Sequence, residues 1–350
     1  RRDHGFTIPD PQLTLELGIP NACNRCHTEE TTEWAVKYVE EWYGDRMDRR
    51  TRRRTRAVAR AWEADPEVIP ELLDLLQDEE IPAWRSVLVA LLSPWVDRPE
   101  IRQVFEQGLK EDHPLVRSAA VRGLAVLPDT YDLIRPLRRD PARLVRLDAG
   151  FATVNPRERD PANYQEILAY LDNICDQPAG ALRRAQFAWS EGRLDEAERW
   201  ARRVSEWEAT QALGPIMLGR VLHAQGRFQD AENWLLKAQR REPGSAEPPY
   251  NLGLLYAEMG APDKALASLQ RAVTNGPAFG RAWYNLGLAH AQFEQLDEAR
   301  RALERAGNAM PTSADAPYAL ATIHLRRGDT EAARAAVEKA LAISPGYTPA

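Results

Sequence analysis

Small residues and prolines in the second half of the chain recur every 34 residues, within segments whose apolar positions follow a helical period. Leucine followed by a small residue, and then a proline, mark the repeat: Leu218-Gly219, Leu252-Gly253, Leu286-Gly287, Leu320-Ala321 and Pro243, Pro277, Pro311, Pro345. Small residues let two antiparallel helices approach closely, and proline ends the second helix. The pattern predicts five helix pairs, at about 178–211, 212–245, 246–279, 280–313 and 314–347.

This arrangement resembles the tetratricopeptide repeat (TPR), whose helix pairs stack into a solenoid. Glycines end the predicted first helices of four units, at Gly192, Gly226, Gly260 and Gly328. The fourth unit has Glu294 at this turn, and the first unit is degenerate, with Ala185 in place of the helix-contact glycine and no closing proline. We therefore expect a TPR array over residues 178–350.

Between residues 46 and 177, shorter helical patterns alternate with turns that contain proline and aspartate. A weaker repeat places Arg85, Arg117 and Arg146 at intervals of 32 and 29 residues. An aspartate before the helix start, then arginine and small residues, is similar to short HEAT repeats, in which a capped helix packs closely on its neighbour. The chain is thus predicted to be all-α, a helical-repeat solenoid with HEAT-like repeats before the TPR array and a joint near 156–180.

The first 45 residues are predicted to form an extended segment followed by one helix. Pro9, Pro11 and Pro20 exclude a continuous helix over residues 1–30. A helix is expected over 31–44, where Thr31 or Thr32 caps and Gly44 ends it. Its predicted apolar face holds Trp34, Val36, Val39 and Trp42. Whether the two tryptophans pack on a group bound by the preceding segment or on the next helix stays open.

Two thiols and an imidazole in this segment define the candidate chemistry. Cys23, Cys26 and His27 form Cys-x-x-Cys-His, the pattern of a c-type haem attachment site. Each thiol adds to one haem vinyl group, and the histidine binds the iron as an axial ligand. A zinc site would need further ligands, and the remaining cysteine, Cys175, is distant. A thioredoxin-like pair would need a strand before the motif, whereas Pro20 indicates a loop.

The surrounding residues resemble the last haem-binding segment of multihaem cytochromes c that carry TPRs at the C-terminus. The likeness rests on Arg2-Asp3-His4-Gly5-Phe6, on Pro20-Asn21-Ala22 before the cysteine motif, and on Trp42-Tyr43-Gly44 after it. The resemblance implies at least one haem c and makes His4 a candidate axial ligand, of a neighbouring haem rather than its own. Members have several such motifs and this chain has one, so it is a fragment or processed product, or its neighbouring haems belong to other chains.

A basic run follows the haem segment, with arginines at positions 49, 50, 52, 53, 54 and 56. It suits haem propionates, an acidic partner or an anionic surface. The other interpretation is a solvated helix start that nearby acidic residues, such as those at 78–80, neutralise.

Composition excludes several classes of function. A net charge of −6 argues against a dedicated nucleic-acid binder, and no apolar run is long enough to span a membrane. No phosphate-binding glycine loop or serine-hydrolase motif occurs, so we expect no enzyme, although an upstream part could hold a catalytic haem. The resemblance implies export to the periplasm or cell exterior, with membrane association through partners. The abrupt start at Arg1 fits cleavage or truncation.

Two functions remain open. The first is a c-type cytochrome subunit or fragment that transfers electrons to another cytochrome, redox protein or second copy. The alternative is a non-redox TPR scaffold in a larger extracytoplasmic complex. Either would bind a peptide or protein segment in the TPR groove, where we expect these residues at 34-residue spacing: Tyr250, Asn251, Tyr284, Asn285 and Tyr318. The competing interpretation is that the tyrosines fill the gap between successive first helices.

Overall fold

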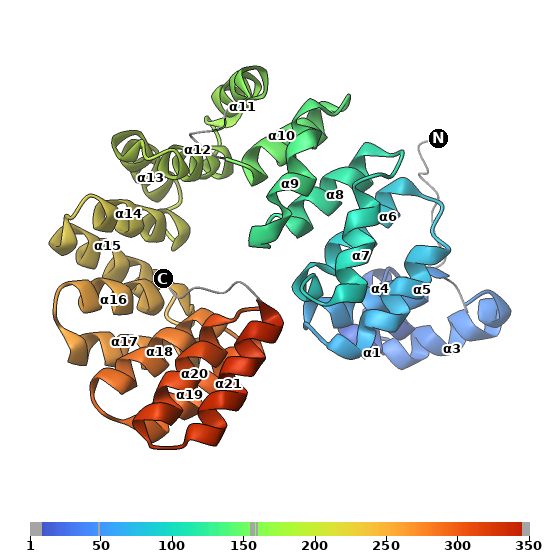
Figure 1. Ribbon diagram of the computed structural model, residues 1–350. Coiled ribbons are helices and arrows are strands. Elements are labelled where there is room, and N and C mark those ends of the chain that lie inside the picture. Colours follow the sequence, from blue (N-terminus) through green and yellow to red (C-terminus); the bar gives the residue numbers. More distant parts are fainter. Residues whose placement is uncertain (1–8, 48–49, 155–157, 159, 345–350) are drawn as a thin grey trace. The chain divides into compact units, whose positions relative to one another are not determined.

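The protein is helical throughout the part that the computed structural model describes, which comprises residues 9–47, 50–154, 158 and 160–344. No strand occurs in these ranges, so the predicted all-α class is confirmed. The helices form two compact units, Arg1–Thr153 and Val154–Ala350 (Figure 1). The domain limits expected at 45/46 and 177/178 stay predictions. Within the described ranges, no helix combines the length and the apolar character needed to cross a lipid bilayer.

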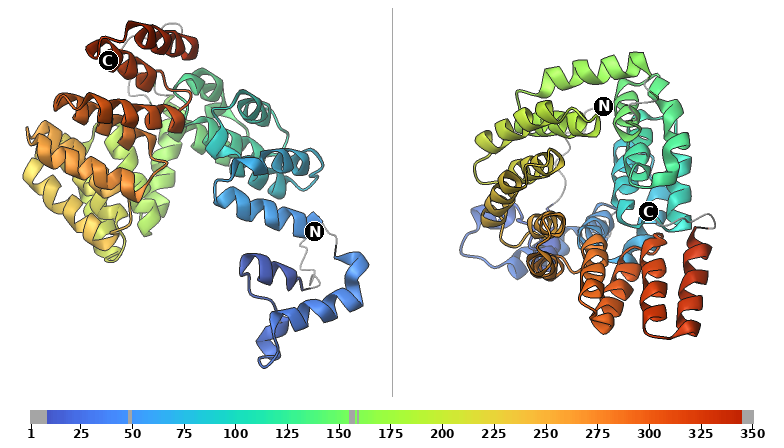
Figure 2. Two further views of the ribbon diagram at one scale, coloured as in Figure 1. Left: turned by 90° about the horizontal axis from the view of Figure 1, so that it is seen from below. Right: turned by 60° about the vertical axis from the view of Figure 1, so that its left-hand side comes forward.

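The second unit is a solenoid of antiparallel helix pairs, and each pair packs on the next (Figures 1 and 2). Helix α11 (Pro161–Ile174) precedes the array and packs on its first helix. The first helices are α12 (Pro178–Ser190), α14 (Leu213–Ala224), α16 (Glu247–Glu258), α18 (Gly280–Gln292) and α20 (Asp315–Arg326). The second helices are α13 (Leu194–Trp207), α15 (Phe228–Arg241), α17 (Pro262–Asn275), α19 (Leu296–Ala309) and α21 (Thr330–Ile343). The five pairs predicted from the 34-residue period are confirmed.

Close approach within each pair depends on the small residue that follows the repeated leucine. In the third pair, a Cβ atom added at Gly253 would lie 2.7 Å from Cγ of Leu269, which is far below a normal carbon contact. Leu252 beside it is buried, and Ala265 of the facing helix is buried as well. The glycine therefore fixes the distance between α16 and α17, and the same arrangement recurs at Gly219 and Gly287.

The turn inside four helix pairs has a glycine with a positive φ angle. These angles are 73° at Gly192, 74° at Gly226, 69° at Gly260 and 80° at Gly328. The fourth pair has the same backbone turn, but Glu294 occupies it with a φ angle of 56°. A left-handed conformation costs a residue with a Cβ atom about 1–2 kcal/mol, and glycine avoids this cost. The sequence departure at Glu294 is thus a local source of strain.

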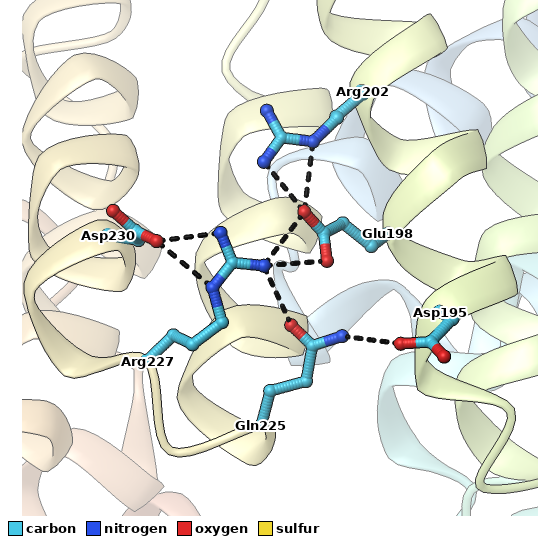
Figure 3. A network of polar contacts seen from close by, with 6 residues as sticks. All are labelled: Asp195, Glu198, Arg202, Gln225, Arg227 and Asp230. Carbon is cyan, nitrogen blue, oxygen red and sulfur yellow. Dashed lines mark hydrogen bonds and ion pairs between the residues drawn. The ribbon is translucent and has the colours of Figure 1, made fainter.

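Polar side chains join the first two TPR units (Figure 3). Glu198 on α13 accepts hydrogen bonds from Arg202 on its own helix and from Arg227 at the start of α15, at 2.6–3.1 Å. Burial opposes ionisation of Glu198, but hydrogen bonds from these arginines and from Gln225 hold its pKa below the usual range. Arg227 also pairs with Asp230 at 2.7 Å. Both arginines of this network therefore bind carboxylates.

The first unit contains shorter helices around a continuous apolar core. Its helices after residue 49 are α4 (Arg50–Trp62), α5 (Ile69–Gln77), α6 (Pro82–Leu91), α7 (Pro99–Gly108), α8 (Pro114–Leu124), α9 (Tyr131–Ile134) and α10 (Arg143–Ala152). Helices α6, α8 and α10 pack side by side. Phe105 of α7 is fully buried against the bare backbone of Gly123 on α8. This packing agrees with the HEAT-like pattern expected from the sequence.

The arginines of the weak repeat join α6, α8 and α10 to the turns beside them. Arg85, Arg117 and Arg146 each donate to two backbone carbonyls shortly before their own helix, at 2.7–3.1 Å. Those of Arg117 and Arg146 lie in the preceding turn, and those of Arg85 lie at the end of α5 and in the turn after it. Arg117 also forms hydrogen bonds of 2.8 and 2.9 Å with the buried carboxylate of Asp140 in the following turn. Arg85 pairs with Glu111 in the same way. Arg85 and Arg117, which bind both backbone carbonyls and a carboxylate of the following turn, therefore each link two consecutive turns.

Arg54 adds an earlier rung to this arginine ladder (Arg54, Arg85, Arg117 and Arg146). It lies 31 residues before Arg85, on α4. Its buried guanidinium is 2.8 Å from the carboxylate of Glu79 and 3.6 Å from the ring centroid of Trp84. The sequence repeat did not reveal this rung, because Arg54 lies among five other arginines of the basic run.

The segment before α4 is only partly extended, which corrects the expectation for residues 1–30. Two short helices interrupt it, α1 (Gln12–Leu17) and α2 (Cys23–Cys26). Pro11 precedes the first helix and Gly18 ends it in a left-handed conformation. No continuous helix forms over the described residues of this segment, as the prolines predicted, but Pro11 and Gly18 bound a short one. The helix expected over 31–44 is confirmed as α3 (Thr32–Tyr43), where the Thr31 side chain accepts from the backbone N–H of Trp34.

Replacing Glu294 with glycine should stabilise the TPR array. The change removes the left-handed strain at the cost of one exposed ion pair, to Arg326 at 2.7 Å, which is worth less than about 1 kcal/mol. We expect Glu294→Gly to raise the free energy of unfolding by about 0.5–1 kcal/mol, measured by urea denaturation. Gly260→Ala at the equivalent turn is the matched control and should lower it by about 1 kcal/mol. If Glu294→Gly lowered the free energy of unfolding as Gly260→Ala does, the turn at Glu294 would not be strained.

Candidate functional site

The cysteine motif and one face of α3 enclose a common hollow on the first unit. The hollow has a volume of about 290 Å³. It is lined by Ala22, Cys23, Cys26, His27, Trp34, Ala35, Tyr38, Val39 and Trp42. Both cysteines, the imidazole and the aromatic and aliphatic side chains of α3 therefore border one space. The lining is mostly apolar, as expected of a site for a flat organic group.

Backbone geometry brings the two thiols and the imidazole of the motif together. The four residues of α2 form a single helical turn, and the N–H of His27 donates to the carbonyl of Cys23 at 3.0 Å. Cys23 is half-buried, whereas Cys26 and His27 are exposed. Both cysteines are free thiols. This local fold places His27 directly after the turn that carries both sulfur atoms.

Two asparagines hold the turn against the start of α3. The Asn21 side chain accepts from the backbone N–H of Asn24 at 3.1 Å and donates to the Thr14 hydroxyl at 3.0 Å. The Asn24 amide in turn donates to the carbonyls of Glu30 and Thr31, at 2.9 and 3.3 Å. These contacts fix the motif relative to α3 without using the thiols or the imidazole. The Cys-x-x-Cys spacing leaves the two intervening residues unspecified, so it gave no indication of this role for Asn24.

Aromatic side chains continue from His27 along α3. Ring centroids lie 4.9 Å apart for His27 and Trp34, 5.0 Å for Trp34 and Tyr38, and 5.6 Å for Tyr38 and Trp42. The spacing of four residues places the last three rings on one helix face. Trp42, at the far end, remains 64% exposed. The face differs from the predicted one, because Tyr38 lines the hollow and Val36 does not.

Ion pairs attach this segment to the first HEAT-like helix. Arg52 on α4 forms two hydrogen bonds of 2.8 Å with Asp10, which precedes α1, and a third of 3.1 Å with Glu40 on α3. The bonds to Asp10 and Glu40 raise the pKa of Arg52 against the opposing effect of burial. Arg56 pairs with Glu16 on α1 at 2.7 Å, and this hydrogen bond lowers the pKa of Glu16. A single face of α4 therefore holds both α1 and α3.

The remaining described arginines of the basic run are also paired with carboxylates of the first unit. Arg50 lies 3.7 Å from Glu79, which also binds Arg54, and Arg53 pairs with Asp74. The run is thus a structural element that joins α4 to neighbouring turns and helices. Its arginines at positions 50 and 52–54 and at 56 already have carboxylate partners, so the expectation of haem propionates or an acidic partner has no support here.

The sequence-predicted haem residues fall into two groups. Cys23, Cys26 and His27 come together at the hollow, as their spacing requires. His4 lies outside the described residues. Within the described ranges, no group of three or more histidine, cysteine or acidic side chains is arranged to hold a metal ion directly. Two free thiols, an imidazole and an apolar hollow thus lie side by side on the first unit.

The residues predicted for the TPR groove are more engaged in packing than expected. Tyr250 and Tyr284 are half-buried and pack on adjacent apolar clusters, and the Tyr250 hydroxyl lies 3.3 Å from the amide nitrogen of Asn285. Asn251 and Asn285 donate to backbone carbonyls one turn earlier in their own helices, at 2.8 and 3.0 Å. Tyr318 is the most exposed of the three tyrosines, at 38%. The gap-filling interpretation accounts for the contacts of the first two.

Comparison with protein families identifies the repeats of the second unit. Family models described as tetratricopeptide repeat match residues 250–311, residues 290–350, and residues 178–203 together with 216–237. These parts of the chain are tetratricopeptide repeats, as the 34-residue period predicted. No curated protein sequence matches the chain.

Several solved structures, two of them described as TPR proteins, resemble about half of the chain. MamA of Desulfovibrio magneticus RS-1 is 24% identical, covers 49% of this chain and 98% of its own, and has a TM-score of 0.42. YrrB, a TPR protein with an unusual peptide-binding site, is 23% identical, covers 51% and 93%, and has a TM-score of 0.40. A thermophilic TPR protein of Thermus thermophilus is 22% identical, covers 49% and 93%, and has a TM-score of 0.41.

Removing the Arg52 guanidinium should loosen the hold of α4 on the candidate site. In Arg52→Gln the carboxylates of Asp10 and Glu40 lose their shared partner, so local opening of α1 becomes easier. We expect backbone amides of α1 to exchange hydrogen about tenfold faster, measured by exchange and mass spectrometry. Arg53→Gln, which removes pairs with Glu71 and Asp74 only, is the matched control and should leave α1 unchanged. Unchanged exchange in both variants would show that Arg52 does not hold the segment.

Proposed function

We propose that the chain is a c-type cytochrome subunit or fragment. It carries a covalently attached haem at the hollow beside α3, and its helical repeats form a scaffold for docking to other proteins. The TPR scaffold is the part that family matches support directly. The attached haem is the further part of the proposal, and a haem at this place would supply electron transfer. A non-redox scaffold is the alternative.

The observation that carries the proposal is the common hollow. Cys23, Cys26, the imidazole of His27 and the rings of Trp34 and Tyr38 all line it. A zinc site would use the thiols and the imidazole, a disulfide would use the thiols alone, and neither would require aromatic rings at four-residue spacing along α3. Covalent haem attachment uses both, because a porphyrin is flat, apolar and large relative to a metal ion.

Each residue has a defined task in this proposal. Cys23 and Cys26 hold the porphyrin through thioether bonds, and His27 binds the iron from the turn that follows. Asn24 fixes the turn on α3, so the imidazole keeps its position beside Trp34. The rings of α3 exclude water from one side, which lowers the local dielectric and tunes the reduction potential. When bound, the haem supplies reversible one-electron chemistry.

His4 is proposed as an axial ligand of a haem, on the Arg-Asp-His-Gly-Phe resemblance. The resemblance favours a neighbouring haem over the one at His27. Export to the periplasm or cell exterior, and further haems upstream or on a partner cytochrome, belong to the same proposal. The TPR array would dock that partner, and Tyr318 is the groove residue with the largest exposed area among the three tyrosines.

Covalent haem is tested by purifying the full chain from cells that mature c-type cytochromes. Denatured protein should retain one haem that acid-acetone does not extract, and its reduced absorption spectrum should show thioether-linked haem. Cys23→Ala and Cys26→Ala should each reduce covalent haem strongly, whereas Cys175→Ala, the matched control outside the motif, should not. Haem-free protein, or haem retention in both motif variants, would favour the non-redox scaffold.

The role of His4 has its own test in the matured protein, together with its partner cytochrome where one copurifies. His4→Ala should convert one low-spin haem to a high-spin or ligand-exchanged form, because an iron site loses its second imidazole. Electron paramagnetic resonance measures this change, with His113→Ala as control. His113 caps α8 through the N–H of Leu115 at 3.3 Å and has no place in the haem site. Identical spectra of wild type and His4→Ala would refute the ligand.

A further inference from the structure

A row of basic residues follows the second helices of the TPR array. Every unit has lysine or arginine at the same place, with a spacing of 34 residues, and we call these five the basic row: Arg203, Lys237, Arg271, Arg305 and Lys339. They lie on α13, α15, α17, α19 and α21 in turn. Equivalent positions of stacked repeats lie along one edge of a solenoid, so the five charges form a continuous line.

No member of the basic row has a carboxylate partner in the described part of the chain, whereas several other cations of the array do. Arg202, Arg227, Arg300, Arg301, Arg326, Arg327 and Arg334 all form ion pairs. For Arg203, Lys237 and Arg305, the contacts seen are with tryptophan rings, at 4.3–5.5 Å from the cation to the ring centroid. The contrast with Arg227 is clear in Figure 3, where carboxylates surround the guanidinium.

Few acidic residues lie near the members of the row on their own helices. Residues three or four positions away are neighbours on a helix, which gives about twenty such positions for the five members of the row. Only Glu206 among these is acidic, whereas Arg199, Arg240, Arg241 and Arg301 add further positive charge. Burial and then the charges of Arg241 and Arg240 lower the pKa of Lys237, as expected where like charges are crowded. A bound anionic group would relieve this repulsion.

Complementary charge lies on the other unit of the same chain, beside the candidate haem hollow. Residues 28–41 contain five glutamates and one lysine. Four of these glutamates are exposed and form no ion pair within the described residues: Glu29, Glu30, Glu33 and Glu41. Glu40 alone is engaged, with Arg52. We call these four the acidic edge.

Exposed tryptophan accompanies both charged surfaces. Trp42, beside Glu41, is 64% exposed, and Trp207, which lies 4.5 Å from the Arg203 guanidinium, is 40% exposed. Tryptophan and arginine are enriched in protein interfaces, where they bury area and contribute most of the binding energy. An anionic lipid surface would match the basic row but would leave the acidic edge without a partner.

We propose that the basic row of one copy of this chain docks on the acidic edge of a second copy. The contact joins different surfaces of the two copies, so it is head-to-tail and can continue from copy to copy. It places the Cys23–His27 hollow of one molecule against the TPR array of the next. The proposal does not depend on haem attachment, because both surfaces belong to the polypeptide.

Sedimentation velocity of the purified full chain tests the contact. Wild-type protein should associate at about 50 mM salt and dissociate at about 500 mM, because exposed charge pairs are screened. Arg203→Glu/Arg271→Glu should weaken association about tenfold or more, and so should Glu29→Lys/Glu41→Lys. Arg98→Glu/Arg281→Glu has the same net charge change at exposed positions outside the row and should associate as wild type does.

Mixing the two reversed variants distinguishes a specific contact from a general charge effect. The row variant and the edge variant should each remain monomeric alone and associate with one another. The intact acidic edge of the row variant can bind the intact basic row of the edge variant, and the two reversed surfaces are also complementary. Far-UV circular dichroism of each variant establishes that the helices are intact. Monomeric wild type at low salt, loss of association in the Arg98/Arg281 control, or failure of the mixture to associate would overturn the proposal. Row-dependent binding to anionic phospholipid vesicles, with monomeric wild type, would assign the row to a membrane instead.

Discussion

Close packing of helices through small residues is the constraint on which this protein depends. At Gly253 the facing Leu269 leaves no room for a Cβ atom, and Gly219 and Gly287 meet leucines in the same way. The short distance lets each helix pair bury a continuous apolar strip although its helices have only 12–14 residues. Because each pair packs mainly on its neighbours, the array extends by repetition and presents equivalent positions along its length. The basic row exists as a line for this reason.

The first unit reaches a similar result with a different interaction. Its helices are shorter and less regular, and arginines with carboxylate and carbonyl partners join consecutive turns. Buried ion pairs contribute little net stability compared with apolar contacts, but breaking one leaves an uncompensated charge, so they fix register. Arg54 and Arg52 lie two residues apart in sequence and serve different purposes. Arg54 joins α4 to the repeats, and Arg52 joins α4 to the segment with the cysteine motif.

The candidate site is held in position by the contacts of Arg52 with the segment that carries the motif. A motif of five residues cannot position an imidazole alone, and the turn of α2 has no buried residues. Asparagine hydrogen bonds hold it on α3, and Arg52 holds α3 on α4. A chain of polar contacts therefore runs from the motif to the HEAT-like core. The TPR array contributes a large surface with regularly placed charge, which is the property expected of a scaffold.

The sequence by itself determined the repeated elements and the residues of the motif. The 34-residue period specified five helix pairs, because each departure from it would change a helix contact, and the Cys-x-x-Cys-His spacing specified which side chains share a turn. Only the tertiary structure decided which arginines of the basic run are structural, because their partners, such as Asp10 for Arg52 and Glu79 for Arg54, lie 42 and 25 residues away. The structure also showed that Tyr38, and not the predicted Val36, lines the hollow. The orientation of α3 depends on its contacts with α1 and α2, which the local pattern does not specify. Local spacing specifies a helix face, and long-range packing specifies what that face contacts.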